Sequence, residues 1–112
     1  GIDNDKTAVK VAMENIEING ISKSVSILNG SIPDKNIGKY SNDIIVANIS
    51  SKVILDLSKE ITEYLKPRGN LIVSGFLDIN ETEVINKFNK LHLNVVSKLA
   101  TADWMALCFR QP

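Results

Sequence analysis

Short polar side chains follow four apolar runs of this sequence, at positions where the strands of a sheet would end. A carboxylate at such a position can accept both hydroxyl protons of a ribose, and an amide there can face a ligand. The candidates are Asp3 after Gly1-Ile2, Asn29-Gly30-Ser31 after 25–28, Asn48 after 43–47, and Ser74-Gly75 after 70–73. Because parallel strands bring their carboxyl ends to one edge of a sheet, the sequence predicts a ligand site there.

Two of these candidates carry the chemical argument, and each also has an ordinary structural explanation. Asp3 taken alone is more commonly a helix cap or a solvated loop residue, and Asn48 divides between capping the next helix and contacting a ligand. Their shared position at the edge of one predicted sheet is what favours ligand binding for both.

Other kinds of site have no support in the sequence. We find no catalytic triad, paired-carboxylate motif, metal-binding cluster or phosphate-binding glycine loop. Cys108 is the single cysteine, which excludes an internal disulfide and a cysteine-based metal site. The 13 basic and 13 acidic residues cancel, which argues against a broad nucleic-acid-binding surface. No apolar run approaches the about 20 residues that span a bilayer, and no signal peptide is visible, so we expect a cytoplasmic protein without membrane contact.

The first half of the chain predicts one helix and two strands. Asp5 is placed to cap a helix whose inward face is Val9, Ala12, Met13 and Ile16, and Asn19-Gly20 is a left-handed stop signal. A short strand follows at 25–28. The run 43–47 contains Ile44, Ile45 and Val46 in succession, which predicts a strand buried on both faces.

The second half predicts two more helices and three strands. A helix begins after a cap at Ser50 or Ser51, ends at 66–69, and is followed by a strand at 70–76. Asn80 with Glu83 forms a capping-box pattern for the next helix. The runs 93–100 and 104–110 are joined by a tight link near Ala102-Asp103, which predicts an antiparallel hairpin. The inward positions of the helices are Val53, Ile54, Leu57, Ile61 and Leu65, then Val84, Ile85, Phe88 and Leu91.

The order of these elements predicts an α/β fold. Strands that alternate with helices of this length form a parallel sheet with right-handed crossovers, and the closing hairpin adds antiparallel strands to it. With 112 residues and no linker or repeat, we expect at most one domain.

Three stretches together resemble a known family. "GIDNDKTAVKVAMENIEING" is similar to the second strand and following helix of class I S-adenosylmethionine-dependent methyltransferases. With "DIIVANI" and "LKPRGNLIVSGFL", and with "ADWMALCFR" as a terminal hairpin, the chain most resembles the ribosomal protein L11 methyltransferase family. "VANI" is the most telling piece, because the related glutamine and adenine N-methyltransferases carry an Asn-Pro-Pro-aromatic motif there.

The resemblance implies a cofactor, a substrate and roles for the candidate residues. S-adenosyl-L-methionine is the implied cofactor, with Asp3 on its ribose hydroxyls, Asn48 beside its methionine end and the incoming amine, and Asn29 and Gly30 as further cofactor contacts. The implied substrate is ribosomal protein L11, methylated on amino groups. An asparagine carbonyl oxygen can accept an amine hydrogen and aim the nitrogen lone pair without a titrating base.

The resemblance also implies that elements of the family precede Gly1. The family's sheet order is three-two-one-four-five-seven-six, and the first strand, its glycine-rich loop, the first helix and a separate substrate-recognition domain have no counterpart in residues 1–112. We therefore expect an incomplete Rossmann-like sheet, the C-terminal portion of a catalytic domain, which is inactive alone. Two alternatives stay open: another class I protein-lysine methyltransferase, and a non-catalytic α/β nucleotide-binding module.

Overall fold

A computed structural model describes residues 1–112, which form two compact units. The first unit is Gly1–Asp34 and the second is Lys35–Pro112, and each is described by itself.

The first unit is a parallel strand pair with one helix. Strand β1 (Ile2–Asp3) leads into helix α1 (Lys6–Ile18), and strand β2 (Leu28–Asn29) pairs with β1 in parallel. The pairing sets Ile2 opposite Leu28 and Asp3 opposite Asn29. The strand predicted at 25–28 is thus shorter and lies further along the chain.

Local signals set both ends of α1 as predicted. The Asp5 side chain accepts a hydrogen bond from the backbone N–H of Thr7 at 2.8 Å, which caps the first turn. Gly20 has a φ of 66°, and the N–H of Ile21 bonds back to the carbonyl of Ile16 at 3.1 Å. The predicted inward face is only partly correct, because Met13 is 51% exposed.

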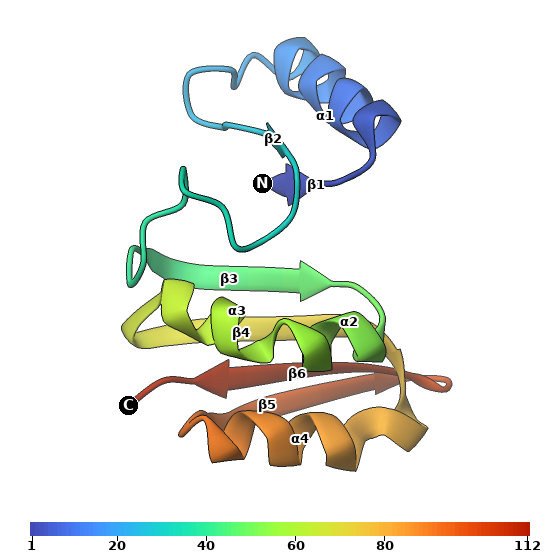
Figure 1. Cartoon of the computed structure of the whole chain (residues 1–112). Helices are drawn as coiled ribbons and strands as arrows, with labels where there is room; N and C mark the ends of the chain where they lie inside the picture. Colours follow the sequence, from blue (N-terminus) through green and yellow to red (C-terminus); the bar gives the residue numbers. More distant parts are fainter. The chain divides into compact units, whose positions relative to one another are not determined.

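The second unit is a mixed four-stranded sheet (Figure 1). Its strands, in spatial order, are β3 (Asn42–Asn48), β4 (Leu65–Leu77), β6 (Trp104–Arg110) and β5 (Asn94–Thr101). β3 and β4 are parallel, whereas β6 is antiparallel to both β4 and β5. This confirms the predicted hairpin and the parallel pairing of 43–47 with 70–75. The order also matches the four-five-seven-six half of the sheet that the resemblance implied.

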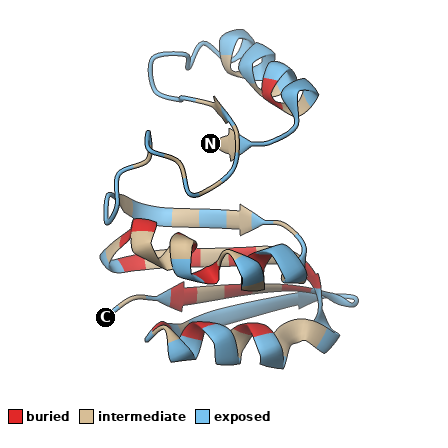
Figure 2. Ribbon diagram, viewed as in Figure 1, coloured by how far each residue is buried: buried red, intermediate tan, exposed pale blue.

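One face of this sheet carries the core. Helices α2 (Ser51–Asp56), α3 (Ser58–Tyr64) and α4 (Glu81–Lys90) pack against it, and Figure 2 shows buried positions on these helices and on β4 and β6. The rings of Phe88 on α4 and Phe109 on β6 are both fully buried, with centroids 4.9 Å apart. Alternate residues of the strands fill the same layer.

The prediction that 43–47 is buried on both faces is wrong. Ile44 is 60% exposed and Val46 is 64% exposed. Both belong to the face of β3 that points away from α2 and α3, and β3 is the edge strand of its sheet. An apolar run therefore marks a strand here, but it does not reveal which layers cover it.

The single helix predicted from Ser50 to Leu65 is divided into α2 and α3. The break falls at Leu57, and Leu65 already belongs to β4. The buried hydroxyl of Ser58 donates to the carbonyl oxygen of Leu55 at 2.9 Å, so a side chain competes for a backbone acceptor at the break.

The predicted capping box of Asn80 and Glu83 is also wrong. A short 3-10 turn, η1 (Asp78–Asn80), precedes α4, and Asn80 has helical angles of φ −94° and ψ −3°. A capping side chain needs an extended backbone at its residue, and Asn80 makes no such hydrogen bond.

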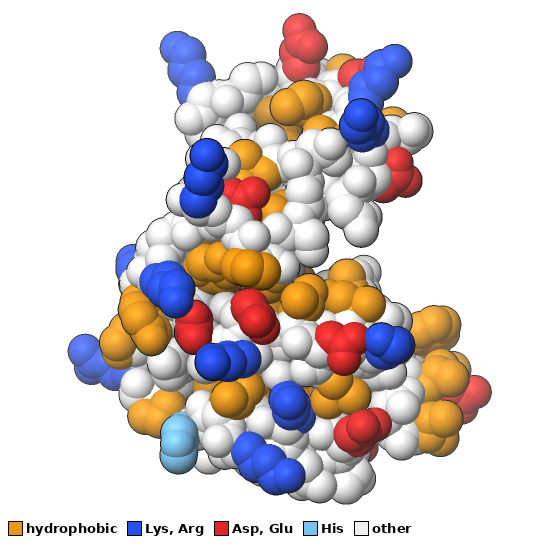
Figure 3. Space-filling view, in the orientation of Figure 1, with side chains coloured by type: hydrophobic (Ala, Val, Ile, Leu, Met, Phe, Trp, Pro, Cys, Tyr) orange, Lys and Arg blue, Asp and Glu red, His pale blue; other side chains and the backbone are white.

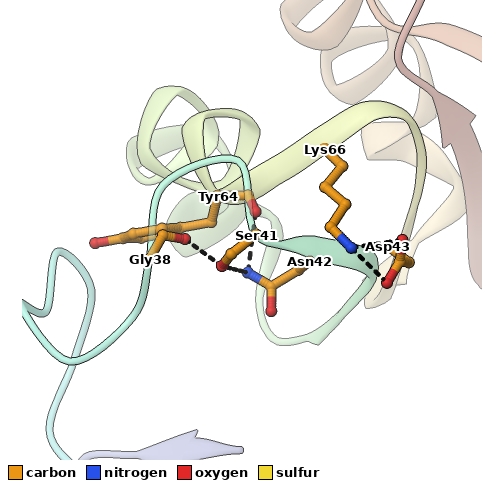
Figure 4. Close-up of polar contacts among 6 residues, drawn as sticks. All are labelled: Gly38, Ser41, Asn42, Asp43, Tyr64 and Lys66. Atoms are coloured by element: carbon orange, nitrogen blue, oxygen red, sulfur yellow. Dashed lines mark hydrogen bonds and ion pairs between the residues drawn. The ribbon is translucent and has the colours of Figure 1, made fainter.

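Polar contacts hold the amino end of β3 and the loop before it, and join β3 to the end of α3 and the start of β4 (Figure 4). The side-chain N–H of Asn42 donates to the carbonyl of Tyr64 at 2.9 Å, and the Ser41 hydroxyl donates to the carbonyl of Gly38. Lys66 contacts both carboxylate oxygens of Asp43, at 2.9 and 3.0 Å. These bonds anchor the end of β3 that lies opposite Asn48.

Candidate functional site

Asp3 ends β1 with its carboxylate exposed and oriented. Its Oδ1 accepts a hydrogen bond of 2.8 Å from the backbone N–H of Asp5, the residue that caps α1. That contact leaves the Oδ2 oxygen and the outer lone pair of Oδ1 for a ligand. A carboxylate held in this way suits two adjacent hydroxyl donors.

Asn29 and Gly30 lie next to Asp3, as predicted, and the structure shows what they do there. The Asn29 side-chain N–H donates to the backbone carbonyl of Asp3 at 3.2 Å, and the Gly30 N–H donates to the same oxygen at 2.9 Å. Both residues therefore support the loop that carries the Asp3 carboxylate. Direct contact with a cofactor stays a prediction for both.

Asn48 ends β3 in the second unit and does not cap the next helix. The cap of α2 is Ser50, whose hydroxyl oxygen faces the N–H of Val53 at 3.5 Å. Asn48 instead receives a hydrogen bond on Oδ1 from the Ser74 hydroxyl at 3.2 Å. This removes the helix-cap explanation and leaves an exposed amide at the carboxyl end of a parallel strand.

A hollow of about 470 Å³ adjoins this amide. The ends of β3 and β4 form one side, and the β5–β6 hairpin forms the other. Trp104, which is 58% exposed, lies in this wall opposite Thr101. The lining residues are Asn48, Ser74, Gly75, Leu99, Thr101, Trp104, Met105 and Ala106.

None of these lining side chains is ionisable at ordinary pH, so the hollow offers hydrogen bonds and apolar surface but no general base. The charged contacts that shift proton affinity lie elsewhere. A hydrogen bond to Glu63 raises the pKa of Lys39, and the same contact lowers the pKa of Glu63. A hydrogen bond to Asp56 raises the pKa of Lys52 on the surface of α2. On the face that Figure 3 shows, basic and acidic side chains are interspersed.

The structure groups Asp3, Asn29 and Gly30 at the two-stranded sheet of one unit, and Asn48, Ser74 and Gly75 at the four-stranded sheet of the other. The prediction that Asp3 and Asn48 share the edge of one sheet is therefore wrong for residues 1–112. Sequence reasoning missed the hairpin side of the hollow. Leu99 and Thr101 alternate along one strand face, but this pattern alone does not show that the face borders the end of β3.

No group of three or more His, Cys, Asp or Glu side chains is arranged to hold a metal ion. None of the helices combines the length and the apolarity that crossing a membrane requires.

Comparison with known proteins gives a family across the whole chain. The family described as ribosomal protein L11 methyltransferase (PrmA) matches residues 1–112. The curated ribosomal protein L11 methyltransferase of Ruminiclostridium cellulolyticum is 40% identical over 111 residues, which are 99% of this chain and 35% of the relative. The chain therefore spans about a third of the length of the curated relatives it matches.

Solved structures agree on the fold. The ribosomal protein L11 methylase of Lactobacillus delbrueckii subsp. bulgaricus has a TM-score of 0.88 and 25% identity, over 99% of this chain and 57% of that one. An RNA methyltransferase of Salinibacter ruber, solved with S-adenosyl-L-homocysteine, has a TM-score of 0.74 and 17% identity, over 100% and 64% of the two chains. The Rossmann-like methyltransferase fold and the family resemblance read from the sequence are both confirmed. The chain belongs to the ribosomal protein L11 methyltransferase family.

Proposed function

We propose that the protein containing this chain transfers methyl groups from S-adenosyl-L-methionine to amino groups of ribosomal protein L11. The observation that carries the proposal is the family match over residues 1–112. The names of the curated relatives supply the substrate, and the exposed amide of Asn48 in a hollow without titratable side chains supplies a fitting chemistry.

The residues of the first unit fit the ribose of the cofactor. Asp3 presents a carboxylate oxygen with no partner in the chain, beside a second oxygen that the Asp5 N–H fixes. Such a pair can accept two neighbouring hydroxyl hydrogens. When bound, the cofactor supplies an electrophilic sulfonium methyl.

The residues of the second unit fit the methyl acceptor. An amine must be neutral to attack, and an environment without counter-charges disfavours its protonated form. The lining of the open hollow includes no carboxylate that would stabilise that form. The Asn48 carbonyl oxygen would accept one amine hydrogen and so orient the nitrogen lone pair for attack.

The test uses the full-length protein with S-adenosyl-L-methionine and purified L11. We expect mass spectrometry to find L11 heavier by whole methyl groups, on lysine side chains or the terminal amine, with an Asn48→Ala variant as the slow control. Methylation of other ribosomal proteins while L11 stays unmodified would overturn the substrate assignment. Failure to bind the cofactor would overturn the activity itself.

A further inference from the structure

We propose that Ser74 and Gly75 are positioning residues that hold the Asn48 amide in one orientation at the end of β3. Only the expected effect on kcat rests on the proposed function. Its structural content rests on the strand register, the space around Gly75 and one hydrogen bond.

The register shows that Gly75 is a bulge residue. In the pairing of β4 with β6, Ser74 lies opposite Ala106 and Phe76 lies opposite Met105, so Gly75 has no partner. Its φ of 88° lies in the region that favours glycine. Bulges of this kind often occur beside active sites, where the extra residue redirects neighbouring side chains.

The space beside Gly75 is filled by the end of β3. A Cβ atom at this position would lie 2.7 Å from Oδ1 of Asn48, 2.9 Å from the carbonyl oxygen of Ile49 and 3.0 Å from its nitrogen. Two of these atoms are backbone and cannot yield by rotating a side chain. The Asn48 carbonyl therefore occupies a place that only a glycine at position 75 leaves open.

Ser74 adds the hydrogen bond that limits rotation of the amide. It pairs with Asn48 across the parallel ladder, and its hydroxyl donates to Oδ1 at 3.2 Å. Its backbone carbonyl accepts the N–H of Ile49 at 3.1 Å, so the ladder continues past Asn48. A carbonyl oxygen has two lone pairs, and the second one remains free to accept a hydrogen bond from the amine that is to be methylated.

Fixing this amide matters because the last torsion of asparagine is otherwise broad. If the Asn48 amide rotates by half a turn, its NH2 group replaces the carbonyl oxygen at the substrate amine. The amine hydrogens then have no acceptor, and the nitrogen lone pair of the amine is not aligned. Ser74 and Gly75 thus act on the alignment step, which affects kcat more than substrate binding.

The first experiment compares Ser74→Ala with Ser97→Ala in the full-length protein. Ser97 is an exposed serine of the same sheet whose side chain makes no hydrogen bond, so it is the matched control. We expect Ser74→Ala to lower kcat by about 2- to 10-fold, the scale of one hydrogen bond, with little change in KM or in cofactor Kd. Ser74→Thr, which keeps the hydroxyl, should restore kcat.

A second readout does not depend on methyl transfer. The side-chain amide signal of Asn48 in a nitrogen-15 NMR spectrum is assigned by its loss in Asn48→Ala. We expect Ser74→Ala to shift this signal and increase its fast motion, whereas Ser97→Ala leaves it unchanged. If the wild-type protein fails to methylate L11, the proposed function fails, and this signal still decides the role of Ser74.

Gly75→Ala is compared with Gly20→Ala, since both glycines have positive φ but no atom lies within 4 Å of a Cβ at Gly20. We expect both variants to lose thermal stability, and only Gly75→Ala to lower kcat, by more than Ser74→Ala does. If Gly75→Ala does not fold, the Ser74 variants carry the test. A Ser74→Ala enzyme with the kcat of Ser97→Ala and an unchanged Asn48 signal would overturn the proposal.

Discussion

The carboxylate of Asp3 and the backbone N–H of Asp5 are joined by a hydrogen bond of 2.8 Å. Asp5 in turn uses its own carboxylate to cap α1 through the N–H of Thr7, also at 2.8 Å. The start of the helix therefore orients Asp3 through the backbone of Asp5, while the side chain of Asp5 stabilises the helix. The carboxylate proposed to bind the cofactor is that of Asp3, whereas the carboxylate that stabilises the helix is that of Asp5. Mutations at the two positions can therefore separate an effect on binding from an effect on stability.

Asp3→Ala in the full-length protein is expected to weaken S-adenosyl-L-methionine binding by roughly 1.5–3 kcal/mol, the usual scale for hydrogen bonds to a charged group. Asp3→Asn keeps one acceptor oxygen for the Asp5 N–H and should lose less affinity. Titration calorimetry measures both variants. Unchanged affinity in Asp3→Ala would remove Asp3 from the cofactor site.

Asp5→Ala is expected to show the opposite pattern. Loss of the cap should lower the free energy of unfolding by about 1 kcal/mol, because the N–H of Thr7 loses its partner. Cofactor affinity should change little, since Asp3 is held by the backbone of Asp5 and not by its side chain. Thermal unfolding and calorimetry on the same samples test this, with Asp5→Ser as the variant that keeps a cap. A large loss of cofactor affinity in a folded Asp5→Ala protein would show that the side chain of Asp5 also serves cofactor binding, and would contradict this prediction.

Asn48→Ala is expected to lower the rate constant of methyl transfer more than it weakens cofactor binding, because the aligned amine matters chiefly in the transition state. Single-turnover rates and cofactor Kd values measured on one preparation provide the comparison. Equal losses in both quantities would make Asn48 mainly a cofactor ligand. No loss in either would leave it a surface residue at a strand end.

Features determined by neighbouring residues in the sequence were predictable here. The cap at Asp5, the stop at Gly20 and the tight turn near Ala102 each depend on a few consecutive residues, and all three occur in the structure. Asn48 was located for a related reason, because a polar residue after an apolar run marks the end of a strand.

Features that depend on distant residues were not predictable. The exposure of Ile44 and Val46 depends on which layers cover β3, and the apolar run carries no information about those layers. The break at Leu57 depends on a buried hydroxyl, that of Ser58, whose burial follows from helix packing. The hairpin side of the hollow depends on register, and a bulge at Gly75 changes that register.

The last prediction is that the 112-residue chain by itself binds S-adenosyl-L-methionine poorly and transfers no methyl group. Its two groups of candidate residues belong to different compact units, and its six glycines include no closely spaced set that would form a phosphate-type loop. The exposed Ile44 and Val46 on an edge strand also favour association over ligand binding. Calorimetry on the isolated chain and on the full-length protein, each first shown to be folded by circular dichroism, should give saturable binding for the full-length protein alone. Micromolar binding by the isolated chain with a defined stoichiometry would show that residues 1–112 already hold the cofactor site.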